Sequence, residues 1–411
     1  MINYEKFTLA NGLRVIVHTD KSTPIIAFNI MYNVGARDEV SIKTGFAHLF
    51  EHLMFGGSKN IPDFDKPLQE AGGTSNAFTN NDITNYYVTI PKENLETAFW
   101  LDSDRMLELA FSEKSLEVQR NVVIEEFKQR YLNQPYGDVW LKLRPLAYKV
   151  HPYQWATIGK EISHIENATM DDVKSFFYSH YAPNNAILCV AGDITRTEIE
   201  PLVEKWFGNI PSRKINVRNL PLEPIQTQSR LIEVESKVPA NAIYKAYHMA
   251  NRLDGEFYST DLITDILSRG KSGRLTQELV KEKKLFSEIN AYVTGDMDAG
   301  LLVVNGKLND GINFSTAEQG IAETLNKTQT TLMSDREIEK VKNKWVTNKL
   351  FEDLSVLNKA MNLCYFELLG DIKLYDSEFE KYKAVKAEDI QNSAKKTLQE
   401  GNCSTIHYKA I

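Results

Sequence analysis

Two histidines and a glutamate, spaced His48-x-x-Glu51-His52, are the residues of this sequence whose types and spacing can do chemistry. Imidazoles four residues apart lie on one face of a helix, so both can reach a single ion. Glu51 lies close to that face and can hold a water molecule bound to the ion. The other side chains of residues 45–55 are apolar, which indicates a buried helix. Because buried imidazoles and carboxylates are costly without a partner, the trio predicts a bound zinc ion.

The helix that must supply a third ligand is predicted at residues 115–132, with Ser112 as its cap. A catalytic zinc site has three protein ligands and one open position, so a further buried carboxylate is required. Two adjacent acids, Glu125 and Glu126, occur in this helix. At about 100° per residue, Glu126 falls inside the apolar sector of the helix and Glu125 falls at its rim. Glu126 is therefore the candidate ligand, and Glu125 suits a solvated face better.

An ordinary buried helix is the competing interpretation of this pattern. A lone histidine on an apolar helix is usually a core residue whose ring nitrogens are hydrogen bonded. Three polar groups at ligand spacing are harder to explain in that way, and a coincidence in the core leaves the inward-facing Glu126 unexplained.

The composition is that of an ordinary folded protein with a full core. The chain has 411 residues, of which 42% are hydrophobic and 25% are charged. A net charge of −7 argues against nucleic acid or an anionic membrane as the main partner. Three scattered cysteines are typical of free thiols in a reducing compartment. The sequence begins without a signal-peptide pattern and has no apolar run long enough to span a membrane, so the expected location is the cytoplasm.

The order of predicted elements repeats along the chain. Strands, a helix near 92–109 and a polar-turn hairpin with strands in 71–79 and 84–90 fill the first half, which ends with a helix at 195–207. A polar, proline-containing stretch without periodicity follows, and then a similar order of strands and helices recurs, with helices expected near 257–268 and 275–283. We therefore expect a metal-binding domain at 1–212, a linker at 213–228 and a second domain at 229–411. Only the first domain carries the histidine pair, so we expect one zinc ion per chain.

Together these motifs resemble the pitrilysin/insulysin family of zinc metallopeptidases. His48-x-x-Glu51-His52 has the inverted order of the usual zinc-protease helix. The pattern Arg120-Asn121-Val122-Val123-x-x-Glu126, downstream of it, is also similar to that family. Further segments resemble its short bacterial and mitochondrial-processing branch, namely Ser75-Asn76-Ala77-Phe78-Thr79, Thr84-Asn85-Tyr86-Tyr87, His151-Pro152-Tyr153, residues 181–186 and Gly192-Asp193. The likeness covers nearly the whole chain and is densest in residues 10–195.

The resemblance implies an α+β fold of two similar domains, each a mostly antiparallel sheet with helices packed on one face. It implies zinc held by His48, His52 and Glu126, with Glu51 as the general base of a metalloendopeptidase. It also implies that Asn76, Ala77, Phe78 and Thr79 form an edge strand that binds extended peptide substrates. Subunits of that branch pair as a clamshell around a peptide chamber.

The sequence departs from the family pattern at three positions. Gln119 stands where family members commonly have a glutamate seven residues before the ligand glutamate, so its support of the metal carries no charge. Val280 and Ser287 stand where the family usually has an arginine and a tyrosine that bind substrate near the zinc. Neither valine nor serine can bind the substrate as the arginine and tyrosine do. After a local shift of the alignment, Lys281 or Tyr292 would take that role. We therefore expect a heterodimer with a related subunit that supplies the Arg/Tyr pair.

The alternative function is that of a non-catalytic structural subunit, since this fold has relatives that serve as core proteins of respiratory complexes. Those relatives lose metal ligands, whereas this chain retains all three candidate ligands and the glutamate base. The metallopeptidase is therefore the preferred prediction, and zinc content discriminates between the two.

Overall fold

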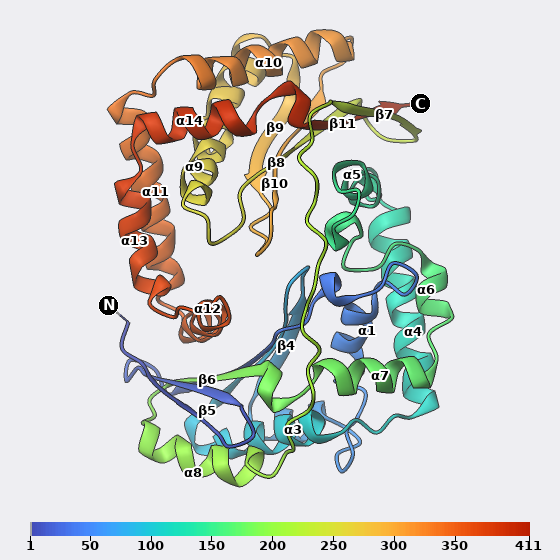
Figure 1. Ribbon diagram of the computed structural model, residues 1–411, viewed down its shortest axis with the longest axis vertical. Helices are drawn as coiled ribbons and strands as arrows, with labels where there is room; N and C mark the ends of the chain where they lie inside the picture. Colours follow the sequence, from blue (N-terminus) through green and yellow to red (C-terminus); the bar gives the residue numbers. More distant parts are fainter. Residues whose placement is uncertain (1) are drawn as a thin grey trace. The chain divides into compact units, whose positions relative to one another are not determined.

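The computed structural model describes residues 2–411, and these residues form two compact units (Figure 1). Each unit combines segments that are far apart in the sequence. Unit 1 comprises the residues up to Gln129, Trp155–Leu220 and Lys349–Ser377, and unit 2 comprises Arg130–Gln154, Pro221–Asn348 and Glu378–Ile411.

Unit 1 is built on a six-stranded, mostly antiparallel sheet. Its strands lie in the order β1 (Glu5–Thr8), β2 (Arg14–Thr19), β6 (Ala186–Gly192), β3 (Ile25–Tyr32), β5 (Thr84–Pro91) and β4 (Thr74–Thr79). Only β2 and β6 pair in parallel. The central strands β3 and β6 are almost continuous apolar runs and are buried on both faces, as expected for strands covered on both sides.

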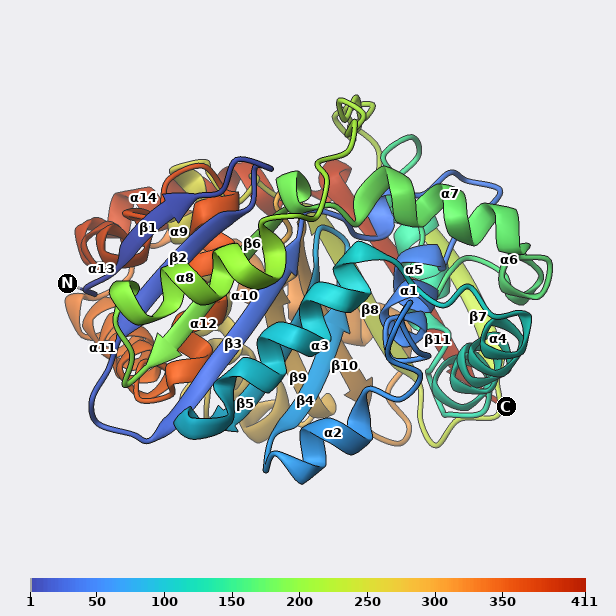
Figure 2. The ribbon, with the colours of Figure 1, turned by 90° about the horizontal axis from the view of Figure 1, so that it is seen from below.

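The helices of unit 1 lie on both faces of this sheet. They are α1 (Phe46–Leu53), α2 (Asp65–Glu70), α3 (Leu95–Leu107), α4 (Glu113–Phe127), α6 (Ile162–Glu166), α7 (Met170–His180), α8 (Arg196–Phe207) and α12 (Val356–Leu368). Phe28 of β3 packs against Phe99 of α3 and Phe207 of α8, so these two helices share one face (Figure 2). Asn29, the next residue of β3, points to the opposite face and donates a hydrogen bond to Cys364 Sγ of α12 at 3.3 Å.

Unit 2 repeats this strand arrangement with five strands. Their order is β7 (Arg230–Ser236), β11 (Cys403–Ala410), β8 (Ala242–His248), β10 (Leu301–Leu308) and β9 (Phe286–Val293). Again only the first pair, β7 and β11, is parallel. In strand order and direction β7, β11, β8, β10 and β9 therefore correspond to β2, β6, β3, β5 and β4, and the predicted fold of two similar domains is confirmed.

Helices also lie on both faces of the second sheet, so the expectation of helices on one face of each sheet was wrong in this respect. The helices of this part are α5 (Val139–Ala147), α9 (Glu256–Ser268), α10 (Phe314–Thr330), α11 (Asp335–Glu352), α13 (Leu374–Ala384) and α14 (Ala387–Thr397). One hydrophobic core lies between the sheet and α9, α10 and α14. A second core, on the other face, is formed by α5, whose Val139 and Leu143 pack with Ala242 and Ala246 of β8.

Shorter helical turns complete the chain. They are the 3-10 turns η1 (Ala36–Asp38), η2 (Lys92–Asn94), η4 (Pro152–Gln154), η5 (Pro183–Asn185) and η7 (Glu400–Asn402), and the π-helical segments η3 (Lys128–Leu132) and η6 (Thr276–Glu282). The sequence pattern predicted an ordinary helix at 275–283 and did not predict strand β1.

The expected linker, residues 213–228, has no helix or strand and is divided between the units after Leu220. In unit 1, Arg218 pairs with Asp38 at 2.7 Å. In unit 2, Glu223 accepts hydrogen bonds from the backbone N–H groups of residues 149–151. The compact units are not contiguous in the sequence, which differs from the expected ranges 1–212 and 229–411, because residues 130–154 and 349–377 pack with the other half of the chain.

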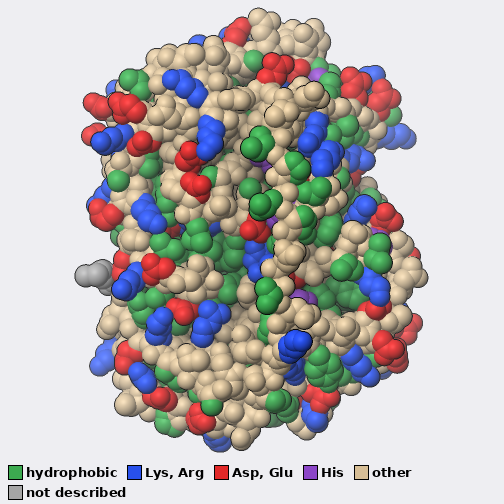
Figure 3. Space-filling view, in the orientation of Figure 1, with side chains coloured by type: hydrophobic (Ala, Val, Ile, Leu, Met, Phe, Trp, Pro, Cys, Tyr) green, Lys and Arg blue, Asp and Glu red, His purple; other side chains and the backbone are tan. Residues whose placement is uncertain are grey.

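Charged side chains of both signs are interspersed on the face drawn in Figure 3, so no single sign dominates that face. Cys189, Cys364 and Cys403 are buried free thiols. None of the helices in the described part of the chain combines the length and the apolarity that crossing a membrane requires.

Candidate metal centre

Helix α1 carries the His-x-x-Glu-His motif, and its apolar side chains hold it in unit 1. Phe46, Ala47, Leu49, Phe50 and Leu53 are buried. The Phe50 ring packs against Phe176 of α7 and against Tyr181, at centroid distances of 4.9 and 5.2 Å. These contacts turn the remaining face of α1, with His48 and His52, towards α4.

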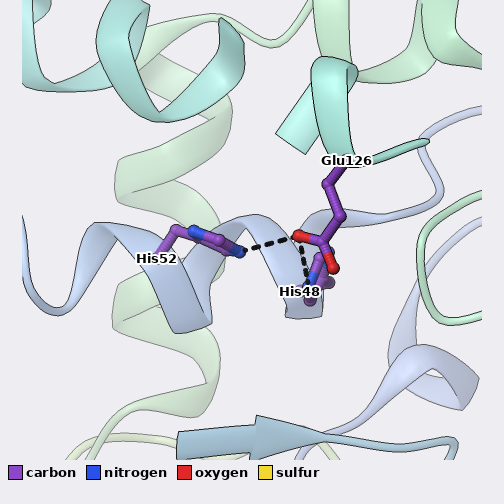
Figure 4. A group of neighbouring side chains, drawn as sticks. All are labelled: His48, His52 and Glu126. Carbon is purple, nitrogen blue, oxygen red and sulfur yellow. Dashed lines mark ion pairs between the residues drawn. The ribbon is translucent and has the colours of Figure 1, made fainter. Parts of the chain in front are cut away.

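Glu126 of α4 faces both imidazoles (Figure 4). Its Oε2 atom lies 3.6 Å from His48 Nε2 and 3.4 Å from His52 Nε2. The three side chains are only 12%, 23% and 17% exposed, in the order His48, His52 and Glu126. Within residues 2–411, this is the one group of at least three His, Cys, Asp or Glu side chains with ligand atoms close enough together to hold a metal ion.

The two separations between Glu126 and the histidines fit a tetrahedral zinc site, and all three ligand atoms lie within 4.8 Å of one another. Zinc binds imidazole nitrogen and carboxylate oxygen at about 2.0–2.2 Å, which places neighbouring ligand atoms of a tetrahedron about 3.3–3.6 Å apart. The distances from Glu126 Oε2 to the two Nε2 atoms fall in this range. Two neutral imidazoles and one carboxylate are also a donor set that catalytic zinc sites use, with a fourth position left for water.

Glu125 and Glu126 lie in different environments, as the helical phase predicted. Glu125 is 61% exposed and pairs with Lys128 at 2.7 Å, whereas Glu126 is turned inward. The helix begins with Ser112, whose side chain accepts the N–H of Ser115, and its α-helical part ends at Phe127, directly after Glu126. A π-helical segment follows, a distortion that is frequent at functional sites.

Glu51 is partly buried on α1 between the two histidines. The pKa values of two nearby tyrosines, Tyr86 and Tyr181, are raised mainly because their side chains are buried. The negative charge of Glu51 raises both pKa values further. The Tyr86 hydroxyl donates to the carbonyl oxygen of Phe50 at 3.4 Å, so the backbone beside Glu51 is held as well.

Gln119 lies on α4 two helical turns before Glu126 and is partly buried. Seven residues of an α-helix bring a side chain back to nearly the same face, so Gln119 shares the face of Glu126. Its amide has both a donor and an acceptor but adds no charge to this face.

The predicted substrate strand is β4, which lies at the edge of the sheet and pairs only with β5. Its side chains alternate: Asn76 and Phe78 are exposed, while Ala77 and Thr79 are half-buried. β4 also contacts α1, so a strand edge lies beside the helix that carries the histidines.

The two positions of the absent Arg/Tyr pair lie in unit 2. Val280, in η6, packs against the hydrophobic core of that unit. Ser287, in β9, donates a hydrogen bond to the carbonyl oxygen of Lys307 at 3.3 Å. Of the two residues that would compensate, Lys281 donates to the carbonyl oxygen of Lys271 at 2.9 Å, and Tyr292 is a partly exposed residue of β9.

Sequence reasoning missed Glu39, which contacts the start of α1. This carboxylate is buried and accepts hydrogen bonds from the backbone N–H groups of Gly45 and Ala47. The available signal was a helix that begins at a glycine, which has no side chain to cap it, with an acid in the preceding loop.

Comparison with models of known protein families shows which family the chain belongs to. The model of the insulinase family of peptidases, M16, matches residues 14–154, and the model of the M16 inactive domain matches residues 167–344. The chain belongs to the M16 peptidase family.

Curated M16 relatives are similar over most of the chain. The zinc protease PqqE of Helicobacter pylori is 28% identical, over 99% of this chain and 93% of the relative. An uncharacterised zinc protease of Bacillus subtilis, YmxG, is 25% identical over 96% of each chain. The probable beta subunit of the mitochondrial-processing peptidase of Arabidopsis thaliana is 24% identical, over 72% of this chain and 58% of the relative.

Solved M16 structures share the fold. The crystal structure of a protease from Helicobacter pylori superposes with a TM-score of 0.93 and 28% identity, and all of both chains is covered. The M16 inactive domain from Pseudomonas fluorescens superposes with a TM-score of 0.89 at 17% identity, over 100% of this chain and 98% of that one, a likeness that concerns the fold alone.

Proposed function

We propose that this chain is a zinc metalloendopeptidase that hydrolyses extended or unstructured peptides and is the zinc-bearing subunit of a heterodimer. One observation carries the proposal: His48 and His52 converge on a single oxygen of Glu126, at 3.6 and 3.4 Å, with Glu51 on the same helix. The relatives named zinc proteases support it.

In this proposal His48, His52 and Glu126 hold zinc, and Glu51 moves the proton. Zinc bound there supplies a Lewis acid that polarises the peptide carbonyl and lowers the pKa of water to about 7. The Glu51 carboxylate accepts a proton from the attacking water and then delivers it to the nitrogen of the leaving amine. The C–N bond breaks, the water oxygen becomes part of the new carboxyl group, and the products are one acid and one amine.

The substrate, in this proposal, adds to the free edge of β4 as a further strand. Backbone hydrogen bonds then give affinity with little dependence on sequence, and the side-chain alternation of residues 74–79 sorts substrate side chains to two faces. An extended peptide is required for this mode, which is why folded proteins are not the expected substrates.

A related subunit completes the enzyme in this proposal. Valine at position 280 carries no hydrogen-bond donor, and the serine at 287 is much shorter than a tyrosine, so neither can help to hold a developing oxyanion. The similarity to a chain named as a beta subunit of a processing peptidase supports a two-subunit enzyme.

The experiment that tests the chemistry is the variant Glu51→Gln. We expect the variant to bind one zinc ion per chain, as the wild type does, because Glu51 is not a proposed ligand. Cleavage of an unstructured fluorogenic peptide should fall by about 10²–10⁴-fold, the usual contribution of a general base.

Metal content distinguishes this proposal from the alternative, a non-catalytic core subunit. Absence of zinc from the purified wild type after metal loading would favour the structural subunit. Unchanged cleavage by the Glu51→Gln variant would disprove the role given to Glu51.

A further inference from the structure

A buried acid outside the motif contacts the backbone of the metal-binding helix. Glu39 Oε2 accepts the N–H of Gly45 at 2.9 Å, and Oε1 accepts the N–H of Ala47 at 2.8 Å. The residue is only 7% exposed. Burial raises the pKa of this group, whereas the N–H groups of Ala47 and Gly45 donate to its ionised form and lower the pKa. Burying a carboxyl group costs free energy unless it is hydrogen bonded, and here both of its oxygens accept hydrogen bonds from one short stretch of backbone.

That stretch is the first turn of α1, which lacks a cap of its own. The first N–H groups of a helix have no partner within the helix, and a Ser, Thr, Asp or Asn side chain at the N-cap normally accepts one of them. The N-cap here is Gly45, which has a φ of +88° and no side chain. Glu39 supplies the acceptors from six residues upstream, and Ala47, the second donor, directly precedes His48.

Several contacts hold the loop that carries Glu39, among them three that involve side chains. Trp155 Nε1 donates to the carbonyl oxygen of Ala36 at 2.9 Å. Arg37 pairs with Asp82 at 2.9 Å, and both side chains are almost fully buried. Arg218 contacts both carboxylate oxygens of Asp38, at 2.7 and 2.9 Å. The Glu39 carboxylate is therefore fixed by neighbours that do not belong to α1.

We propose that Glu39 is a positioning residue for the metal centre. By holding the N–H groups of Gly45 and Ala47, its carboxyl group fixes the axial position and the rotation of α1, and with them the point at which His48 presents Nε2. This inference rests on the proposed function, in which His48, His52 and Glu126 bind zinc.

The test is the variant Glu39→Gln, which has the same shape but only one acceptor oxygen, so its amide N–H group faces a backbone N–H donor. We expect zinc affinity, measured by competition with a chelator, to fall about tenfold, the lower end of what outer-sphere variants of metal sites lose. The visible absorption spectrum of the cobalt-substituted chain, which reports ligand geometry, should also change.

Asp104→Asn is the matched control. Asp104 is another buried acid of unit 1, and it accepts the backbone N–H of Asn60 at 2.9 Å and the Ser58 hydroxyl instead of the N–H groups of α1. This variant loses a comparable buried contact, so we expect a lower melting temperature with unchanged zinc affinity and cobalt spectrum.

A second variant, Glu39→Asp, serves if the glutamine variant does not fold. It keeps the acid but is one methylene shorter, so it reaches one of the two N–H groups and should also weaken zinc binding. Wild-type zinc affinity in a folded Glu39 variant would overturn the inference, as would an equal loss in Asp104→Asn. A wild-type chain that binds no zinc would instead contradict the proposed function.

Discussion

Adjacent glutamates near the end of α4 show how one residue step separates an inward-facing position, the proposed ligand, from a surface position. A step along an α-helix turns the side chain by about 100°. Glu125 therefore reaches solvent and Lys128, whereas Glu126 reaches the space between His48 and His52. The chemical group is the same in both residues, and only the helical phase differs.

This difference gives a prediction with a built-in control. Glu126→Gln should lower zinc affinity on the order of 100-fold or more, because a ligand is lost and outer-sphere changes alone cost 10–100-fold. Glu125→Gln should leave zinc affinity unchanged and cost at most about 0.5 kcal/mol of stability, as for an exposed i,i+3 ion pair. Chelator competition and chemical unfolding measure the two quantities. A loss of zinc only in the Glu125 variant would show that the ligand assignment is wrong.

The sequence was sufficient to predict the residues that converge here, but not the residue that holds their helix. His48, Glu51 and His52 are close in sequence, and the apolar periodicity around Glu126 indicates its inward direction. Glu39 instead contacts the backbone N–H groups of Gly45 and Ala47 through a loop, and no periodic pattern encodes such a contact. Its capping role becomes visible only when the path of residues 39–45 is known.

At the scale of elements, the contact between α1 and the edge strand β4 places the candidate metal ligands beside the proposed substrate strand. The strand pairs on one side with β5, and within the described residues no strand pairs with its other side. Unpaired strand edges are templates for the addition of another chain. In a peptidase this property serves for capture of an extended peptide.

Peptide binding should therefore protect β4 from amide hydrogen exchange. With a non-cleavable extended peptide bound to the zinc-loaded chain, exchange at residues 74–79 should slow at least about tenfold where new hydrogen bonds form. β1 (Glu5–Thr8), the opposite edge of the same sheet, is the internal control and should be unaffected. Equal protection of both edges, or of neither, would contradict substrate binding by strand addition.

The sequence was a better guide to the type of each helix or strand than to the elements against which it packs. The hairpin of β4 and β5 and the helices α3, α4, α8 and α9 occur close to their expected ranges. An apolar pattern can indicate that a helix is buried, but it cannot tell which of two similar sheets that helix covers. The structure shows that α12 covers the first sheet and α5 covers the second, each from the other half of the sequence.

For the whole molecule, the two units share a strand arrangement but differ in chemistry. The one candidate metal group of the described chain lies in unit 1, whereas unit 2 has Val280 and Ser287 at the positions where the resemblance to the family implies an arginine and a tyrosine. This chain has the candidate metal ligands but lacks the arginine and tyrosine. This composition agrees with the proposal that a related subunit supplies the Arg/Tyr pair.

The partner requirement can be measured directly. The zinc-loaded chain alone should cleave an unstructured peptide weakly, and a related subunit with the Arg/Tyr pair should raise kcat/KM by about 10²-fold or more, the loss seen when one oxyanion donor is removed. Changing the tyrosine of that partner should abolish the gain. Full activity of the chain alone, with no effect of the partner, would show that no second subunit is needed.

The position of α12 in the sequence has a consequence for biosynthesis. The ribosome completes β6 at Gly192, but the helix that covers this strand begins only at Val356. At about 5–20 residues per second, the nascent sheet waits roughly 10–30 seconds for that cover. During this interval the face with Ala27, Met31 and Cys189 is exposed, and exposed apolar strands are bound by chaperones or aggregate. We therefore expect efficient production of this protein to depend on protection of the uncovered face of this sheet while the second half of the chain is still being translated.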